Sequence, residues 1–465
     1  MDRRHETARV TRLGPALFAL ALGCSGGHDD GSGGTEGSDS TTGGGTTTGA
    51  SVTGSGTSEG GTTEGASSGS TSAGGICGDG KTDPGEACDD GNGEDGDGCN
   101  ADCTVGGAMR WETIFDTGVS ASEAFYAVDV DDNGEIVAAG VIAVAPDDTR
   151  MLLSKRDATG AEVWTWTWAG MTPGRAQLVD VAVVPGVGIF VTGRVETAGG
   201  TTEAWTGRFD GNGVLEWMHT RGGNPVYDAH AVALDVTSED ELLVAVERVP
   251  VGETDTGFLV LRYGFDGTVV GSAEHDPTPG DDDCTDIAVL DDGSYVVTGR
   301  ADSMGAYVAR LDAMGTPIWE RSFAPLGGNA TAVAADGEGA LVAAMQMQAQ
   351  PTRVDAIVRR YGPLGSVDWE YVRFGEDFAF LYALASDDLG RAVLAGWTQP
   401  SNGDPSQPMV HKLDPTGARL WASDVTTHRV PFAVLVRPDL RVLVAGYAPS
   451  RRGTDTDAWI AELAP

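Results

Sequence analysis

A unit of about fifty residues repeats from Met109 to the end of the chain, and this repeat limits the possible folds more than any other feature. Each unit holds four short runs of alternating side chains, separated by Asn-Gly, Asp-Gly and other glycine-containing turns. The fourth run carries a tryptophan shortly after a glycine in every unit but one. These positions are Trp111, Trp164, Trp217, Val270, Trp319, Trp369 and Trp421, separated by 53, 53, 53, 49, 50 and 52 residues. So regular a spacing indicates a tandem repeat.

Three other positions of the unit recur with the same spacing, and we call each set of equivalent residues a column. The second run ends at Gly140, Gly193, Val246, Gly299, Met345, Gly396 and Gly446. The third run carries Lys155, Arg208, Arg262, Arg310, Arg360 and Lys412, with Glu462 in the last unit. The first run starts at Tyr126, Val179, His230, Thr285, Thr331, Tyr382 and Phe432 and continues mostly with Ala or Asp on one face. Because the basic column is regular, we interpret it as structural, each charge pairing with a turn carboxylate such as Asp157, Asp210, Asp312 or Asp414.

Period-two runs of five to seven residues joined by glycine-containing turns predict β-hairpins. Four strands per unit, repeated over residues 109–465, predict an all-β fold, the β-propeller. Small side chains in the first strand suit the crowded axis of a propeller. A tryptophan on the outer strand would cover the widening gap between blades and bury roughly 150–250 Å².

The unit count predicts how the ring closes. Seven units begin with a first strand, but the seventh ends at Leu463 after its third strand. The run around Trp111 has no unit before it, so strand 109–115 should pair with strand 457–463 and complete the last of seven blades. Closure of this kind removes the open sheet edges that favour aggregation.

The segments KLDPTGARLW, RLDAMGTPIW and RFDGNGVLEW resemble the tryptophan-bearing repeat of PQQ-like propellers and other bacterial β-propeller repeats. The resemblance covers residues 109–465. It implies the fold and leaves the activity open, because one propeller hosts many functions.

Residues 1–23 are predicted to be an export signal. Four arginines precede an apolar stretch, LGPALFALALG, which is too short to span a bilayer. It ends at Leu20-Ala21-Leu22-Gly23-Cys24, which resembles a bacterial lipobox with Ala21 in place of the usual leucine. The resemblance implies that Cys24 becomes the lipidated first residue and that the chain is held at the outer membrane or cell surface. The alternative is an ordinary secretory signal followed by a stray cysteine.

Residues 24–75 are almost entirely Gly, Ser and Thr, so we expect a flexible tether with a mean reach of about 40 Å. The formal net charge is -39. That charge excludes nucleic-acid binding through phosphate neutralisation. It favours solubility outside the cell, and we expect a monomer that meets the membrane only through the lipid.

Four cysteines, Cys77, Cys88, Cys99 and Cys103, lie in residues 76–104, which contain few apolar side chains. A segment this short needs cross-links, and in an exported chain disulfides are favoured over zinc. Spacing alone leaves three pairings open. The string CGDG…GEACDDGN…DGDGC…C resembles the cysteine-rich repeat of myxobacterial surface proteins, which implies an extracellular disulfide module. Its candidate calcium ligands are Asp79, Glu86, Asp89, Asp90, Asn92, Asp95 and Asp97, against the alternative of solvated acidic turns.

No catalytic motif stands out. The histidines form no HxH or HExxH pair, no GxSxG elbow is present, and Cys284 is expected to be a small buried thiol. Quinoprotein dehydrogenases usually carry eight blades and a vicinal cysteine pair, which this chain lacks. We therefore expect no cofactor other than calcium.

The loops that join one blade to the next would surround one mouth of the propeller channel, a usual ligand site. The candidate binding residues there are Arg175, Arg221, Tyr227, Asp282, Arg373 and His428, with Asp281 and Asp283 beside them. The favoured hypothesis is a lipid-anchored binding or scaffold protein that engages a protein or polysaccharide at this mouth. The alternatives are a carbohydrate-active or quinone-dependent enzyme, which would need two carboxylates or a cofactor at the mouth, and a periplasm-facing assembly scaffold.

Overall fold

The computed structural model describes residues 11–12, 76–118, 121–170, 174–222, 227–250, 257–278, 280–302, 304–324, 328–337, 339–349, 352–373, 378–399, 407–423, 425, 428–450 and 455–465. Most of the predicted export signal, Cys24 and the predicted tether lie outside these residues. Every regular element among them is a β-strand, and no described helix is long and apolar enough to cross a membrane.

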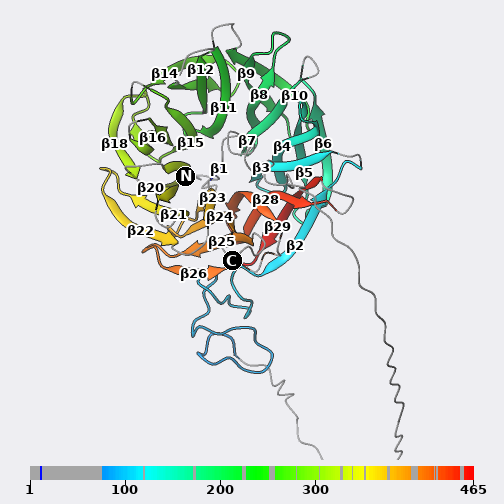
Figure 1. Cartoon of the computed structure of the whole chain (residues 1–465). Coiled ribbons are helices and arrows are strands. Elements are labelled where there is room, and N and C mark those ends of the chain that lie inside the picture. The colour runs from blue at the N-terminus through cyan, green and yellow to red at the C-terminus, as the bar shows by residue number, and fades with distance from the viewer. Residues whose placement is uncertain are drawn as a thin grey trace, which may run out of the picture.

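The strands form seven sheets arranged in a ring, which confirms the predicted seven-bladed propeller (Figure 1). Each unit supplies its strands in order from the axis to the rim. Blade 1 contains β3 (Ser122–Val130), β4 (Ile136–Ala145), β5 (Asp148–Arg156) and β6 (Glu162–Trp168). Blade 2 contains β7 (Ala176–Val184), β8 (Gly188–Glu196), β9 (Thr202–Phe209) and β10 (Leu215–Gly222).

The next three blades have the same order. Blade 3 contains β11 (Tyr227–Val236), β12 (Glu241–Pro250), β13 (Gly257–Gly264) and β14 (Val269–His275). Blade 4 contains β15 (Asp283–Val289), β16 (Tyr295–Ala301), β17 (Gly305–Leu311) and β18 (Pro317–Ala324). Blade 5 contains β19 (Gly328–Asp336), β20 (Gly339–Ala349), β21 (Thr352–Tyr361) and β22 (Val367–Arg373).

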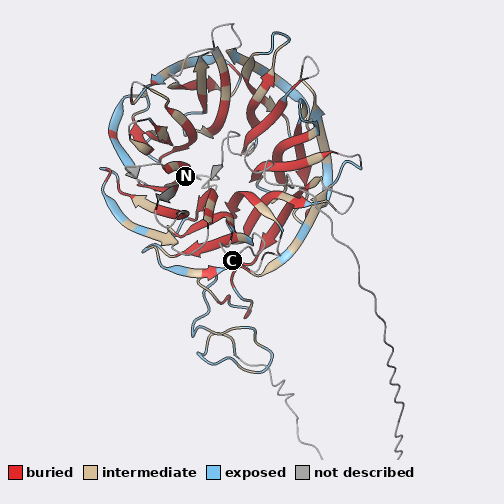
Figure 2. Cartoon of the chain, in the orientation of Figure 1, coloured by how far each residue is buried: buried red, intermediate tan, exposed pale blue. Residues whose placement is uncertain are grey.

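The last two blades complete the ring. Blade 6 contains β23 (Phe378–Ser386), β24 (Ala392–Gln399), β25 (Gln407–Leu413) and a short β26 (Arg419–Ala422). Blade 7 contains β27 (Val430–Val436), β28 (Val442–Pro449), β29 (Thr456–Leu463) and, as its outer strand, β2 (Met109–Phe115). Figure 2 shows that buried residues fill the inner strands and that exposed residues gather on the rim strands.

The chain start closes the ring as predicted. β2 pairs antiparallel with β29, and Trp111 lies opposite Glu462 while Ile114 lies opposite Trp459. The indole Nε1 of Trp459 also donates to Glu112, 2.9 Å away. Strands from the two ends of residues 109–465 therefore share one sheet.

A two-residue strand, β1 (Thr11–Arg12), pairs with the inner strand β27 and lies against the inner strands β3, β15, β19 and β23. It sits near the centre of the ring (Figure 1). Thr11 and Arg12 belong to the segment that is predicted to be removed on export.

Each outer-strand tryptophan covers a glycine of the next blade. A Cβ on Gly213 would lie 3.0 Å from Trp164, and Gly213 has a positive φ of 82°, so only glycine fits this turn easily. The indole Nε1 of Trp164 donates to the carbonyl of Gly211 at 3.2 Å. Trp217 and Trp319 repeat this bond to the next blade. The tryptophans thus join neighbouring blades at the rim.

The register corrects the tryptophan column in blade 3. In the other blades the charged third-strand residue lies opposite the tryptophan, as Arg208 lies opposite Trp217, but Arg262 lies opposite Gly271. Gly271, and not Val270, therefore occupies the tryptophan position. The sequence prediction was wrong by one residue because it counted from the wrong turn residue.

The basic column forms ion pairs, but not with the carboxylates that were predicted. Lys155 Nζ lies 3.1 Å from Asp131 and 2.7 Å from Glu135, which belong to the turn between β3 and β4. Asp157, Asp210, Asp312 and Asp414 instead accept backbone amides of their own turns. In blades 1, 3, 4 and 6 the partners lie in the first turn or directly after it, because the third strand passes beside that turn, whereas Arg208 of blade 2 pairs with Glu216 of β10.

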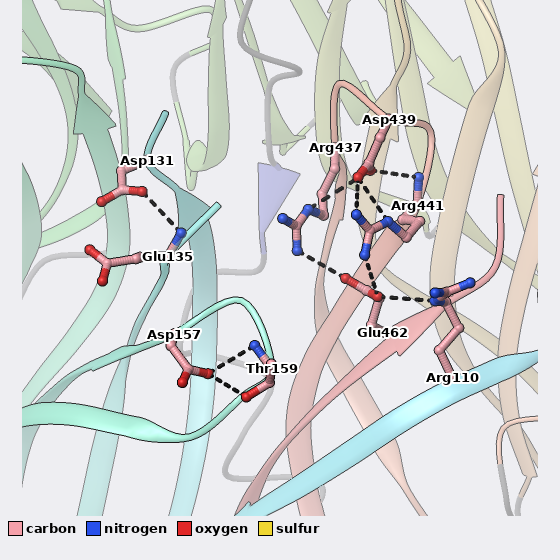
Figure 3. Close-up of polar contacts among 9 residues, drawn as sticks. All are labelled: Arg110, Asp131, Glu135, Asp157, Thr159, Arg437, Asp439, Arg441 and Glu462. Carbon is pink, nitrogen blue, oxygen red and sulfur yellow. Dashed lines mark hydrogen bonds and ion pairs between the residues drawn. The ribbon is translucent and has the colours of Figure 1, made fainter. Parts of the chain in front are cut away.

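Blade 7 reverses these charges. Glu462 replaces the basic residue, and the residues at the positions of Asp131 and Glu135 are Arg437 and Arg441. Glu462 lies 2.9 Å from Arg437 Nη1 and 3.0 Å from Arg441 Nη1, and Arg110 of β2 adds a third cation at 3.3 Å (Figure 3). Glu462, the exception in the basic column, therefore belongs to a cluster in which the acidic and basic positions are exchanged.

Aspartates join the inner strands of blades 1 to 5. Asp129 of blade 1 accepts the amide of Val183 in blade 2 at 2.7 Å, and Asp180 accepts that of Leu234 in blade 3 at 2.8 Å. Asp235 and Asp286 repeat the bond to blades 4 and 5. The Asp positions noted in the first run therefore satisfy amides on the inner edges of the sheets.

The cysteine-rich segment is cross-linked by Cys77–Cys103 and Cys88–Cys99, which resolves the pairing that spacing left open. Cys284 is a free, buried thiol as expected. Disulfides of this kind indicate an extracellular or periplasmic protein. The segment rests on the propeller near β26 and the C-terminus (Figure 1).

Gly107, which follows this segment, completes the ring at the rim. It lies four residues before Trp111, as Gly160 lies four before Trp164, and it packs against Trp421 of blade 6. Its amide donates to Ala464, and its carbonyl accepts a bond from Ser423 Oγ at 2.7 Å. The residues between module and propeller thus provide the turn that blade 7 lacks.

Candidate functional site at the channel mouth

Every inner strand contains a β-bulge at the same place, near the end where the loops between blades enter. The pairing of inner and second strands shifts by one residue there in all seven blades. The bulged residues are Tyr126, Val179, Val232, Thr285, Thr331, Tyr382 and Phe432. Bulges re-aim side chains and are common at functional rims. Val232, and not His230, holds this position in blade 3, so the predicted column was displaced by two residues there.

A glycine on the second strand makes room for the bulge in five blades. A Cβ on Gly193 would lie 2.0 Å from the carbonyl oxygen of Gln177, which no side chain tolerates. Gly140, Gly299, Gly396 and Gly446 have the same close contact. In blade 5 the position opposite is Ala344, since Met345 pairs with Asn329. The prediction of Met345 for this column is therefore wrong by one residue.

Two columns next to the bulge break the sevenfold regularity. On the inner strands they contain Ala124, Gln177, His230, Asp283, Asn329, Phe380 and Val430, and on the second strands Val141, Arg194, Glu247, Arg300, Met345, Trp397 and Tyr447. We call these residues, with the bulged residues, the mouth. Regular columns serve the shared fold, so an irregular column is where a particular function can reside.

Blades 6, 7 and 1 supply an aromatic sector of the mouth. Phe432 lies between Tyr382 and Tyr126, with ring centroids 5.2 and 5.6 Å apart. Phe380 stacks on Trp397 at 4.7 Å, and Trp397 Nε1 donates to the Tyr382 hydroxyl at 2.7 Å. Phe380 and Trp397 remain half-buried, so part of this stack is accessible.

Blades 2, 3 and 4 supply a polar sector. Asp283 pairs with Arg300 at 3.1 Å and is hydrogen-bonded to Glu247. His230 Nδ1 lies 3.6 Å from Glu247. Desolvation, the neighbouring charge of Glu247 and their mutual hydrogen bond raise the pKa of Asp283 to about 6, although Arg300 opposes the shift.

The six predicted binding residues are not brought together. Arg221 and Arg373 lie at the ends of the rim strands β10 and β22, and Arg175 is paired with Asp147 at 2.5 Å. Asp282 is fully buried and accepts bonds from Thr278 and Asp302. His428 is exposed in the loop before β27, and only the backbone of Tyr227, at the start of β11, is described. Their role in binding stays a prediction.

The mouth residues could have been found from the sequence. Arg194, Glu247, Arg300, Trp397 and Tyr447 follow directly after the column that ends the second run. Four different residue types among these five equivalent positions indicate a site without a common structural role. Predicted binding residues were sought in loops instead of on these strands.

The acidic side chains of the cysteine-rich segment are occupied by its own backbone. Asp89 accepts amides of Gly78, Asp79 and Gly80, and Asp95 accepts that of Ala101. Asp90 accepts the amide of Cys99, and Asp97 accepts the Asn92 side chain. Among the described residues no group of three or more His, Cys, Asp or Glu side chains could hold a metal ion. The calcium site stays a prediction.

No protein-family model matches the sequence, and no curated protein matches it. Among solved structures, a protein of unknown function from Dyadobacter fermentans is 12% identical with a TM-score of 0.44, over 77% of this chain and 98% of that one. A polysaccharide lyase is 9% identical with a TM-score of 0.43, over 73% and 89%. The β-propeller domain of the Trilobed protease from Pyrococcus furiosus is 9% identical with a TM-score of 0.41, over 73% and 94%. Likenesses of this strength say nothing about activity.

Proposed function

We propose that this protein is an exported binding module that holds a polysaccharide at the mouth of its propeller channel. The observation that supports this function is the division of the mouth into an aromatic and a polar sector. Aromatic faces stack on the apolar faces of sugar rings, while carboxyl, guanidinium and imidazole groups bond to hydroxyls. The two sectors together therefore suit a sugar polymer.

A carbohydrate-active enzyme is less well supported. Glycosidases hold their two carboxyl groups roughly 5–9.5 Å apart so that the scissile bond or a water fits between them. Glu247 and Asp283 are hydrogen-bonded to each other instead. A pair in direct contact leaves no room for that chemistry.

The lipobox-like segment ending at Cys24 and the myxobacterial-type cysteine repeat support a place at the cell surface. We propose that a lipid on Cys24 holds the tether and that the propeller stands clear of the membrane. Protease treatment of intact cells should cleave the propeller if it is displayed outside. Protection from protease would instead favour the periplasm-facing scaffold.

The binding proposal is tested by titrating the purified exported protein with a panel of polysaccharides. At least one polymer should bind, and Trp397→Leu should weaken that binding about tenfold because stacking on an aromatic ring is lost. Trp168→Leu is the matched control, since Trp168 is also half-buried but lies at the end of the rim strand β6. Equal loss in both variants, or binding of a protein partner at the mouth in place of every polysaccharide, would contradict the proposal.

A further inference from the structure

The mouth contains a guanidinium group without an ion-pair partner. Arg194 of β8 makes one hydrogen bond, from Nη2 to Gln177 Oε1 at 3.2 Å, and no carboxylate among the described residues lies within 4 Å of it. Burial lowers the pKa of Arg194, while its neighbours Tyr126 and Glu247 act in the opposite direction. A half-buried cation without an ion-pair partner is costly for a fold, so a ligand that supplies an anion there would be stabilised.

In blade 4 a carboxylate neutralises the arginine at the position equivalent to Arg194. Arg300 holds in blade 4 the position of Arg194 in blade 2, and Asp283 holds that of Gln177. Asp283 pairs with Arg300 at 3.1 Å. The replacement of that carboxylate by the neutral amide of Gln177 leaves Arg194 available.

Gln177 adds a second unused donor. Its side chain is 8% exposed, and its Nε2 has no hydrogen-bond partner. Nε2 belongs to the same amide whose oxygen accepts from Arg194, so the two donors are separated only by that amide group. A buried N–H without a partner lowers the stability of the fold, and an acceptor from a ligand would remove that cost.

The neighbouring groups indicate which acceptor fits. Arg194 lies near Tyr126, at the border between the polar sector and the aromatic sector, and each shifts the pKa of the other. A planar guanidinium fork matches a carboxylate through two parallel hydrogen bonds. The aromatic sector can stack on a sugar ring, and the Arg194 guanidinium can bind a carboxylate. Together these groups fit a sugar that carries an acid group.

We infer that Arg194 and Gln177 form a subsite for the carboxylate of an acidic sugar, such as a uronic acid residue of a polysaccharide. This inference rests on the proposed function and names the ligand class of that site. The carboxylate accepts from the Arg194 guanidinium and from Gln177 Nε2, and the adjoining sugar ring stacks on the aromatic sector.

The net charge of the chain makes a preference for an acidic polymer informative. The chain carries a formal net charge of -39, which repels anionic polymers at a distance. Preference for an anionic polymer over its neutral form therefore requires a local cationic site. Non-specific electrostatic attraction would not produce this preference, because the net charge of the protein repels the anionic polymer.

The test uses the purified exported protein with polygalacturonate and with its methyl ester, which has the same backbone without the charge. Polygalacturonate should bind about tenfold more tightly than the ester, since charge-assisted hydrogen bonds form only with the acid. Gln177→Asp should abolish that preference, because the new carboxylate would neutralise Arg194 as Asp283 neutralises Arg300. Arg194→Gln should have the same effect, and both variants should lower the affinity for polygalacturonate more than the affinity for the ester.

Arg419→Gln is the control, because Arg419 is an exposed arginine at the start of the rim strand β26. Equal affinity for both polymers, or a preference that survives Gln177→Asp in a folded variant, overturns the inference. If both polymers bind equally and Trp397→Leu weakens both, the acid subsite is wrong and the proposed function stands. If the protein binds neither these polymers nor any neutral polysaccharide, both are overturned. A preference for dextran sulfate over polygalacturonate also overturns the assignment to a carboxylate.

Discussion

Glu462 and Arg437 form a buried ion pair in blade 7, 2.9 Å apart, at the positions that Lys155 and Asp131 occupy in blade 1. The side chain of Glu462 is 1% exposed, and that of Arg437 is 7% exposed. Blades 1 and 7 thus both have an ion pair between the first turn and the third strand, with opposite polarity. At this third-strand position the fold requires that the buried charge be neutralised.

Glu462→Gln should destabilise the protein by about 3 kcal/mol, because Arg437 and Arg441 lose their buried carboxylate and keep only the more exposed Asp439. The triple variant Glu462→Lys, Arg437→Asp and Arg441→Glu, which copies Lys155, Asp131 and Glu135 of blade 1, should recover part of this loss. Urea unfolding measures both effects. Equal destabilisation by Glu462→Gln and by Glu239→Gln, which removes an exposed carboxylate, would contradict the account.

Gly107→Val should weaken ring closure by about 1–3 kcal/mol. Gly107 has φ of +76°, and a Cβ there would lie 2.6 Å from the ring of Trp421. Gly93→Ala is the control, because nothing lies within 4 Å of a Cβ at that position. Thermal unfolding should show a lower midpoint for Gly107→Val only; unchanged midpoints for both would mean that this turn does not hold the ring.

Lys412 should make the folded protein more stable as the pH rises from about 8 to 10.5. Its side chain is fully buried, and desolvation with the nearby Arg391 lowers its pKa to about 8, although Asp387 opposes the shift. The unfolded chain therefore holds one more proton than the folded chain in this window. Stability should rise with pH there by at most about 1.4 kcal/mol per unit.

Lys412→Met removes this dependence and leaves Asp387 paired with Arg391 at 2.7 Å. Denaturant unfolding at pH 8, 9 and 10 should therefore show a smaller slope for the variant than for the natural chain. Lys155→Met is the control, because the partners Asp131 and Glu135 raise the pKa of Lys155 against the effect of its burial. The same slope in Lys412→Met and in the natural chain would contradict the prediction.

Asp180→Asn should loosen the contact between blades 2 and 3. The Asp180 carboxylate accepts the amides of Val181 and Leu234, and an amide side chain has only one oxygen for these two donors. Hydrogen exchange of the Leu234 amide should accelerate about tenfold, with a loss of roughly 1–3 kcal/mol in stability. Asp132→Asn, at an exposed turn, should change neither. Unaltered exchange at Leu234 would show that the aspartates do not join the blades.

The fold could be predicted because its determinants repeat. Seven copies of one pattern make the period visible, and the unpaired run at Trp111 defines the closure that β2 and β29 confirm. The predicted positions of single residues were wrong where a unit departs from the pattern, as at Gly271 and Ala344. Each bulge adds a residue that no local pattern marks, so the phase on either side of it cannot be counted directly.

The candidate site was harder to predict because it depends on contacts between blades. Arg194, Gln177 and Tyr126 come from two blades and meet only when blades 1 and 2 pack against each other. The sequence shows that Gln177 stands where blade 4 has Asp283 only after the bulges have set the register. The disulfide pairing and the ion-pair partners of Lys155 depend on three-dimensional proximity in the same way.

The most direct test of the account is a structure of the exported protein with a bound oligogalacturonate. The account predicts that one carboxylate lies within hydrogen-bond distance of both Arg194 and Gln177 and that the adjoining ring stacks in the sector of Phe380 and Trp397. An oligosaccharide bound at the rim strands or on the cysteine-rich segment, with an empty mouth, would contradict it.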